Sequence, residues 1–182
     1  MLRIAFFFYG TMMVLALLFS WCYVGWKSWW GWRSSWWLEV MLGILGGFGV
    51  VWGSRVGMMR LASGRRLVEE FVLALGKGTR VQMVLLACLS GVSEEALFRA
   101  VLLPSWGWFW SGLCFGLLHV GSRVYFLWWT LFACVFGWGM GLWCTFFPGL
   151  GFPVAFHITV NALNLLWLRN RFRERLKAQE RL

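Results

Sequence analysis

Long apolar windows separated by short polar segments are the dominant pattern of the chain. A helix needs about 20 consecutive apolar residues to cross the hydrocarbon core of a bilayer. Windows that approach or reach this length with almost no charge occur at residues 4–23, 36–52, 81–103, 106–120, 124–147 and 150–168. The pattern therefore predicts an all-α fold, a polytopic transmembrane helical bundle of about six spans.

One further segment follows a different periodicity. Leu67, Phe71 and Leu75 recur every four residues, which places them on one face of a helix. Charged residues fill nearby positions at Arg65, Arg66, Glu69 and Glu70. We expect this segment to be an amphipathic helix that lies along the membrane interface.

The windows and loops divide the chain into three parts. Residues 1–66 are expected to form an N-terminal transmembrane hairpin with a basic loop, residues 67–168 a core, and residues 169–182 a basic tail. Two stretches of small residues, Gly43–Gly53 and Gly137–Gly141, are expected to let helices approach closely.

The composition supports a membrane protein. Hydrophobic residues make up 60% of the chain and the mean hydropathy is +0.70. This is more apolar surface than a soluble core of this size can bury. The five cysteines include no C-x-x-C pair, so we expect small buried side chains and neither disulfides nor a zinc ribbon.

The net charge of +10 comes from clusters that flank the apolar windows. Such clusters favour anionic lipid headgroups as partners and argue against nucleic acid. The largest clusters lie between the second and third windows and after the sixth. Because short cytoplasmic loops collect Lys and Arg, both termini are expected in the cytoplasm. The opposite side would carry only Lys27, Arg33 and Glu39, beside a tryptophan-rich loop at Trp26–Trp37.

The first apolar window has no small-x-small cleavage site before Cys22, so we interpret it as a retained span and not as a secretory signal. The compact composition, rich in Arg, Gly and Trp, favours an integral protein of a prokaryotic inner or cell membrane.

Two adjacent glutamates, Glu94 and Glu95, lie inside the third apolar window, with Arg99 one turn later. An ionisable group at membrane depth costs about 2.5–3.5 kcal/mol on insertion scales, so such groups are usually paired and functional. Glu95 and Arg99 share one side of a helix, whereas Glu94 points about 100° away. We expect Arg99 to hold Glu95, and Glu94 to project into the bundle as a candidate general base.

The chain has two histidines, His119 and His157, and both lie in apolar windows. Asn161 follows His157 by about one helical turn. Counting about 1.5 Å per residue from the expected outer ends of the spans places Glu94, His119 and His157 roughly 10–20 Å deep. We therefore expect these side chains to converge on one pocket.

These polar residues form three motifs in chain order. The motifs are E-E-x-x-x-R at Glu94, Glu95 and Arg99, F-x-x-x-H at Phe115 and His119, and H-x-x-x-N at His157 and Asn161. On these motifs the chain resembles the CPBP (Abi) family of intramembrane endopeptidases, which includes the CAAX prenyl endopeptidase. The resemblance covers about residues 67–168, which would be the peptidase core, and the first two windows carry no motif.

The resemblance implies a glutamate-dependent intramembrane endopeptidase that acts on a membrane-anchored protein or peptide. By match to the motifs, Glu94 and His119 would activate the attacking water, while His157 and Asn161 would form the oxyanion pocket. Candidate substrates are a C-terminal sorting tail, a peptide leader and a lipidated chain end, and processing of sorting tails or maturation of peptides suits a small dedicated enzyme. The supporting residues would be Glu95 and Arg99.

The residues leave the question of a metal open. Glu94, His119 and His157 are a donor set that zinc accepts with a position left free. No H-E-x-x-H motif is present, however. With His157 assigned by resemblance to the oxyanion pocket, a mechanism without metal or other cofactor is favoured.

Two functions from other classes also fit parts of the pattern. A proton-coupled transporter uses buried Glu, His and Arg, but it needs ionisable residues across the full depth of the bilayer. A non-catalytic membrane scaffold or chaperone leaves the motifs unexplained. An aspartyl protease is excluded because the chain has no Asp. A serine mechanism is disfavoured because Ser90, Ser93 and Ser111 lie outside any G-x-S-x-G context, and Ser93 is expected to bond back to its own helix.

Overall fold

The computed structural model describes residues 2–26, 29, 36–75 and 77–181 of the chain. This part of the chain is almost entirely helical and contains no strand. Lys27, Arg33 and most of the tryptophan-rich loop lie outside the described residues. The elements are α1 (Leu2–Phe19), the π-helical turn η1 (Ser20–Val24), α2 (Trp36–Arg60), α3 (Ala62–Leu75), α4 (Arg80–Glu95), the π-helical segment η2 (Ala96–Leu102), α5 (Leu103–Leu117), α6 (Phe126–Phe146) and α7 (Gly151–Gln179).

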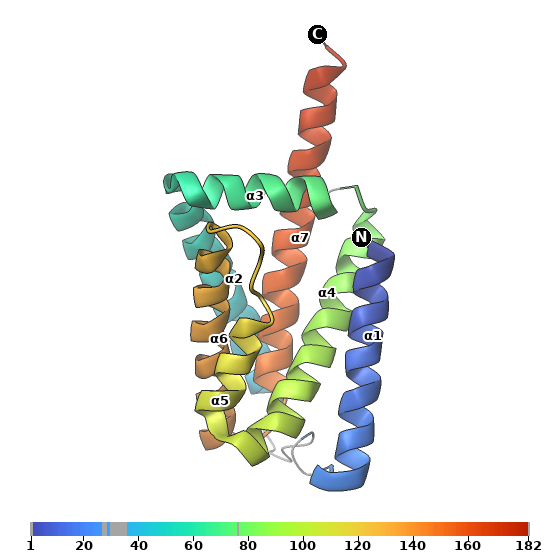
Figure 1. Cartoon of the computed structure of the whole chain (residues 1–182), viewed down its shortest axis with the longest axis vertical. Coiled ribbons are helices and arrows are strands. Elements are labelled where there is room, and N and C mark those ends of the chain that lie inside the picture. The colour runs from blue at the N-terminus through green and yellow to red at the C-terminus, as the bar shows by residue number, and fades with distance from the viewer. Residues whose placement is uncertain (1, 27–28, 30–35, 76, 182) are drawn as a thin grey trace.

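The long helices confirm the all-α polytopic bundle. Figure 1 shows α1, α2, α4, α6 and α7 running along the long axis of the molecule, with α7 packed on both α2 and α4. Within the described residues, five helical stretches are long and apolar enough to cross a membrane. They are Leu2–Val24, Trp36–Arg60, Arg80–Leu117, Phe126–Phe146 and Gly151–Gln179.

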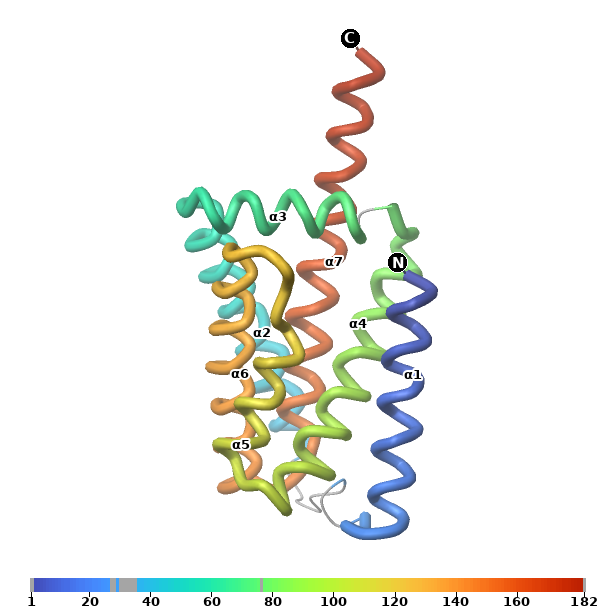
Figure 2. Tube along the Cα trace, in the orientation of Figure 1, coloured from blue at the N-terminus to red at the C-terminus, as the bar shows by residue number. Residues whose placement is uncertain are grey.

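The window at 106–120 differs from the full span expected there. The helical stretch Arg80–Leu117 reverses direction near Gly107, whose φ of 71° breaks the helix. The part of α5 after this glycine is only about 15 Å long at 1.5 Å per residue, half of what a bilayer requires. Figure 2 shows α5 lying beside α6. After α5, a non-helical segment leads to the end of the bundle at which α3 lies.

Glycines let two pairs of helices pack closely. A Cβ added at Gly43 of α2 would lie 2.6 Å from the carbonyl oxygen of Phe152 in α7. A Cβ added at Gly137 of α6 would lie 2.6 Å from the carbonyl oxygen of Gly112 in α5. No side chain fits at such distances, so the close approach depends on glycine. The small-residue faces expected from the sequence are confirmed as an α2–α7 seam and an α5–α6 seam.

Helix α3 lies across one end of the bundle, as Figure 1 shows. Val68 on its apolar face packs with Leu168 of α7, while Glu69 and Glu70 are exposed. Tyr125, which precedes α6, donates a hydrogen bond of 2.7 Å to Glu70, and this bond raises the pKa of Tyr125. The amphipathic helix expected from the pattern therefore covers this end and holds the segment that leads into α6.

The stretch expected as a separate basic tail, residues 169–182, begins inside α7. No Gly or Pro interrupts this stretch, and Arg, Glu, Lys and Leu are good helix formers, so α7 continues to Gln179. Arg169 is buried and donates from Nε to the carbonyl oxygen of Gly78 at 3.1 Å. The start of α1 and this basic extension lie at the same end as α3 (Figure 1). Which side of a membrane this end faces stays a prediction.

Candidate active site

A cavity of about 300 Å³ lies inside the bundle. Every helix from α1 to α7 contributes residues to its lining. Glu94 of α4, His119 after α5, and His157 and Asn161 of α7 all line this one cavity. The structure thus brings together the four residues that the motifs single out, although they are separated by up to 67 positions in the sequence.

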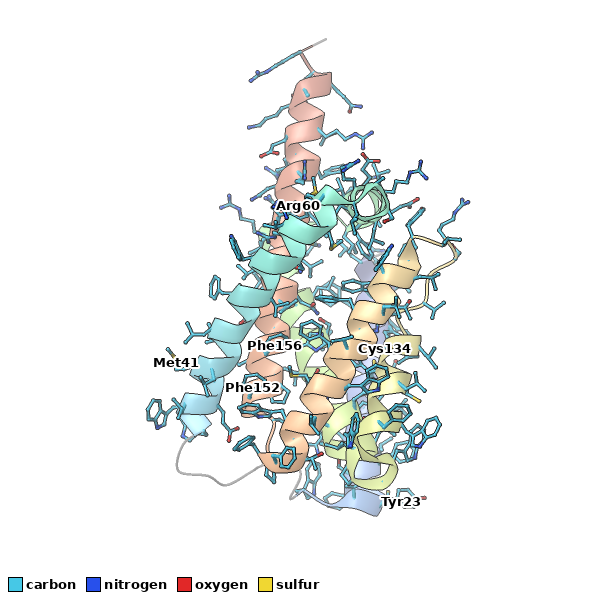
Figure 3. All side chains as sticks on the ribbon, turned by 90° about the vertical axis from the view of Figure 1, so that its left-hand side faces the viewer. Tyr23, Met41, Arg60, Cys134, Phe152 and Phe156 are labelled. Atoms are coloured by element: carbon cyan, nitrogen blue, oxygen red, sulfur yellow. The ribbon has the colours of Figure 1, made fainter. Side chains whose placement is uncertain are left out.

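The part of the cavity wall formed by α6 is aromatic. The ring centroids of Phe132 and Phe136 lie 4.5 Å apart, and Phe136 lies 5.1 Å from Phe156 of α7. Figure 3 shows Phe152 and Phe156 between α2 and α6. An apolar wall beside a charged cluster suits a ligand that is itself amphiphilic.

Glu95 is the centre of a buried charge network. Its Oε2 lies 3.0 Å from Nε of Arg99, as the four-residue spacing predicts, and both side chains are 1% exposed. Its Oε1 lies 2.7 Å from Nδ1 of His157. The Arg99 contact is an ion pair without hydrogen-bond alignment. The guanidinium also lies 4.9 Å from the ring centroid of Phe115, a cation–π distance.

Both histidines are held through Nδ1, which leaves Nε2 facing Glu94. Nδ1 of His119 lies 2.7 Å from the carbonyl oxygen of Phe115, and Nδ1 of His157 faces the Glu95 carboxylate at the same distance. Since both partners accept hydrogen bonds, each Nδ1 carries the proton. Nε2 of His119 lies 3.8 Å from Glu94 Oε2, and Nε2 of His157 lies 3.9 Å from it. These gaps are too wide for direct hydrogen bonds, and each fits a bridging water.

Asn161 is fixed by the helix opposite. Its Nδ2 donates to Oγ of Ser90 in α4 at 2.9 Å, and Ser90 in turn donates to the carbonyl oxygen of Ala87 at 3.2 Å. Asn161 follows His157 by about one turn of α7, so both side chains point from one face toward α4. One N–H of the amide is used in this contact, and the other is left for a ligand.

His119 lies in a turn, because α5 ends at Leu117. Thr130 of α6 donates to the carbonyl oxygen of His119 at 3.1 Å, which satisfies a backbone group freed by the end of the helix. The helical position expected from the apolar window is therefore wrong. Irregular backbone at membrane depth is tolerated where it is enclosed by protein or lines a wet cavity, and His119 meets this condition.

Two further residues of the cavity come from helices in which we expected no chemistry. Tyr9 of α1 lines the cavity, and its hydroxyl hydrogen-bonds the carboxylate of Glu94. Arg55 of α2 lines it as well, because α2 continues past the apolar window at 36–52. A tyrosine among phenylalanines and an arginine in a basic loop carry no spacing signal, so the sequence did not identify them.

The serine alternative gains no support from the geometry. Ser93 donates from Oγ to the carbonyl oxygen of Leu89 at 2.6 Å, as expected for a hydroxyl inside a helix. Ser111 donates to the carbonyl oxygen of Phe98 at 2.8 Å. Neither hydroxyl is paired with a histidine, the partner that a nucleophilic serine requires.

The fit of a metal ion depends on the separations of the donor atoms. Tetrahedral zinc with bonds of about 2.0–2.1 Å holds its ligand atoms about 3.4 Å apart. The separations of 3.8 and 3.9 Å around Glu94 Oε2 are wider. Among the described residues, no group of three His, Cys, Asp or Glu side chains is placed to hold a metal. The donor set does not fit zinc in this arrangement, and we assign no step to a metal.

The comparison with known families agrees with the motifs. Residues 77–163 match the family described as type II CAAX prenyl endopeptidase Rce1-like. The matched region contains the six polar residues of the three motifs. It does not contain Tyr9 or Arg55. No curated protein and no solved structure matches the chain. The match confirms the resemblance drawn from the sequence.

Proposed function

Residues 77–163 belong to the Rce1-like family of CAAX prenyl endopeptidases, so the protein is a membrane-embedded protease, and from this premise we propose how its cavity hydrolyses a peptide bond. The observation that carries the proposal is the convergence of two imidazole Nε2 atoms on one carboxylate oxygen, Glu94 Oε2, inside the cavity. Such a cluster positions and deprotonates a water molecule without a metal.

Glu94 is the general base of the proposed reaction. A water between Glu94 Oε2 and His119 Nε2 hydrogen-bonds to both, and His119 accepts through Nε2 because its Nδ1–H is directed to Phe115. Glu94 takes a proton from this water as its oxygen attacks the carbonyl carbon of the substrate. The same proton then passes to the departing amine, so the glutamate is regenerated when the C–N bond breaks.

His157 and Asn161 stabilise the oxyanion of the tetrahedral intermediate. The N–H of the Asn161 amide that is not bonded to Ser90 donates one hydrogen bond. His157 donates a second from Nε2 when it is doubly protonated, and Glu95 at its Nδ1 stabilises that positive charge. Two such donors lower the barrier by stabilising charge that develops only in the transition state.

Three residues act on the reacting groups through others. Glu95 and Arg99 hold the His157 ring in place, and Tyr9 orients the carboxylate of Glu94. These are positioning residues, and none of them is assigned a bond to the substrate.

The substrate is proposed to be a membrane-anchored protein or peptide. The aromatic wall on α6 suits apolar side chains, and the polar groups around Glu94 suit a peptide bond. The basic end, with α3 and the extension of α7, is proposed to face anionic headgroups of the cytoplasmic leaflet, with both termini in the cytoplasm. A reporter fused after Leu182 tests this orientation, since an external signal would invert it.

Comparison of two glutamate variants tests the function in cells. Glu94→Ala is expected to abolish the protein termini that the wild-type chain generates, as measured by terminal proteomics of membranes. Glu69→Ala, an exposed glutamate of α3, is the control and is expected to leave those termini unchanged. Equal profiles for the two variants would remove the peptidase assignment from this site.

A chelator test addresses the mechanism separately. The proposed reaction is expected to continue at an unchanged rate when the purified protein is treated with a zinc chelator. Inhibition that added zinc reverses would contradict the glutamic mechanism, while leaving the peptidase activity itself intact.

A further inference from the structure

A corner of the molecule at the α3 end brings together the starts of α1 and α4 and a later part of α7. Nε of Arg169 in α7 donates to the carbonyl oxygen of Gly78 at 3.1 Å, two residues before α4 begins at Arg80. Gly78 also lies against α1, because a Cβ added there would lie 3.1 Å from Cδ1 of Leu2. Figure 1 shows the start of α1 beside the start of α4. Three helices therefore meet around Gly78.

Three arginines gather at this corner. Arg173 follows Arg169 by four residues on α7, so the two share one face of the helix. The positive charges of Arg80 and Arg173 are close enough to repel that of Arg169, which is only 6% exposed. Within the described chain, no ion pair involves any of the three arginines. The corner therefore carries a positive charge that no side chain of the described residues offsets.

Another side of α7 shows a different balance of charge. Arg171 and Arg175 line a surface hollow between α7 and α3, and the carboxylates of Glu69 and Glu174 line the same hollow. Both signs of charge are present there. The excess of positive charge around Arg169 is thus a property of one corner and not of the basic end as a whole.

Hydrogen-bond donors at the corner are available to a ligand. Arg169 donates from Nε to Gly78 and from Nη1 to Oδ1 of Asn170 at 3.4 Å, while its Nη2 donates no hydrogen bond within the described chain. The residue that caps α4 bonds the third N–H of the helix and leaves those of Arg80 and Val81. A guanidinium beside the first N–H groups of a helix is suited to phosphate oxygens.

The position of the corner favours a lipid as the source of the phosphate. Two stretches long enough to cross a membrane, those of α1 and α4, begin here. Arg169 lies about 27 Å along α7 from Gly151 at 1.5 Å per residue, close to the thickness of a hydrocarbon core. Four apolar side chains in the first two turns of α1 and α4 are 54–77% exposed, namely Ile4, Phe7, Val81 and Leu85. Acyl chains can cover these side chains while the phosphate stays at the membrane surface.

We propose that the corner formed by Gly78, Arg80, Arg169 and Arg173 binds one phospholipid whose headgroup has a net negative charge. The phosphate accepts hydrogen bonds from Arg169 and from the start of α4, and the acyl chains lie along α1 and α4. A zwitterionic headgroup fits less well, because its ammonium finds no carboxylate in these four residues. None of the four lines the reaction cavity, so the site does not depend on the proposed peptidase function.

Lipid binding to the full-length protein tests the site directly. The protein is purified in a neutral detergent, and bound lipids are counted by native mass spectrometry while phosphatidylglycerol or phosphatidylcholine is titrated. The wild-type protein is expected to bind one phosphatidylglycerol with an affinity at least about 10-fold above that for phosphatidylcholine. Inorganic phosphate is expected not to displace the lipid, because it has no apolar part to cover α1 and α4.

Variants separate this corner from the rest of the basic end. Arg169→Gln is expected to lose the preference for phosphatidylglycerol. Arg80→Gln and Arg173→Gln, both at exposed positions, are each expected to weaken binding about 5-fold. Arg175→Gln, an exposed arginine of the same helix that lines the hollow with α3, is the control and is expected to keep the full preference. The two variants at exposed positions of the corner decide the result if Arg169→Gln does not fold.

The proposal fails on any of three results. Equal affinities of the wild-type protein for the two lipids would refute a site for a negative headgroup. A loss in Arg175→Gln as large as in Arg80→Gln and Arg173→Gln would assign the preference to the charge of the whole basic end. Displacement of phosphatidylglycerol by inorganic phosphate would assign the corner to a soluble anion. None of these results bears on the peptidase function, which is measured by cleavage.

Discussion

The two ends of the cavity treat charge in opposite ways. At the reaction centre, Glu95 is shared between Arg99 and His157, so each charge has a neighbour of opposite sign. At the other end, the contacts of the Arg55 guanidinium among the described residues are with a backbone carbonyl and an aromatic ring. The comparison teaches that charges of opposite sign hold the catalytic groups in place, whereas the cavity also accommodates a cation whose contacts are a carbonyl oxygen and an aromatic ring.

The largest expected effect comes from removing an imidazole at the reaction centre. His119→Ala removes the acceptor that orients the attacking water, and general acid–base groups contribute about 10²–10⁴-fold to a rate. We expect kcat to fall by that factor while the melting temperature stays close to wild type. An effect below about 10-fold would show that His119 only packs beside the site.

Removing the charge of Arg99 tests whether Arg99 and Glu95 stabilise each other in the folded protein. Arg99→Leu leaves Glu95 buried without its cation, which costs about 3–5 kcal/mol of folding free energy in known cases. We expect the midpoint of thermal unfolding, measured by circular dichroism in detergent, to drop by a large amount. The double variant Glu95→Leu with Arg99→Leu removes both charges and is the control, expected to recover much of the loss. Equal destabilisation by the single and double variants would contradict the pairing.

A smaller effect on the rate is expected from changing Tyr9 in α1, a helix that carries none of the three motifs. Tyr9→Phe removes the hydroxyl that hydrogen-bonds Glu94 and retains the ring. Hydrogen bonds to charged groups are worth about 1.5–3 kcal/mol, so kcat should fall about 10-fold or more with KM unchanged. Tyr23→Phe, an exposed position of η1, provides the matched control. A change in KM alone would mean that Tyr9 contacts substrate instead of positioning the base.

The smallest effect is expected at the serine next to the base. Ser93→Ala removes a bond from Oγ to the carbonyl of Leu89 within the same helix. Because that bond is local, we expect kcat to change less than about 2-fold, measured on a peptide that the wild-type protein cleaves. A loss of activity as large as that of His119→Ala would instead favour a serine mechanism.

Local spacing accounts for the part of the site that could be predicted. The Glu95–Arg99 pair follows from a four-residue spacing on one helix, and the His157–Asn161 pair follows from the same rule on another. The amphipathic α3 and the glycine seams follow equally from periodicity and residue size. Each of these features depends on neighbours along the chain, which one sequence displays directly.

Long-range geometry accounts for what could not be predicted. The reversal at Gly107 shortens α5 and leaves His119 in a turn. The sequence does not predict this, because a pattern of apolar residues does not indicate the direction in which a helix runs. The contact of Tyr9 with Glu94 and the contact of Arg55 with Leu163 join residues 85 and 108 positions apart. Such contacts depend on how helices pack, and a single sequence gives no signal for them.

The most direct test of the account is the rate at which Glu94→Gln, purified and reconstituted in vesicles, cleaves a peptide that the wild-type protein cleaves. Glutamine keeps the shape of the side chain and the bond from Tyr9, but it cannot accept the proton of the attacking water. The account predicts a loss of at least about 10²-fold in kcat with peptide binding retained. Cleavage by Glu94→Gln at the wild-type rate would contradict it.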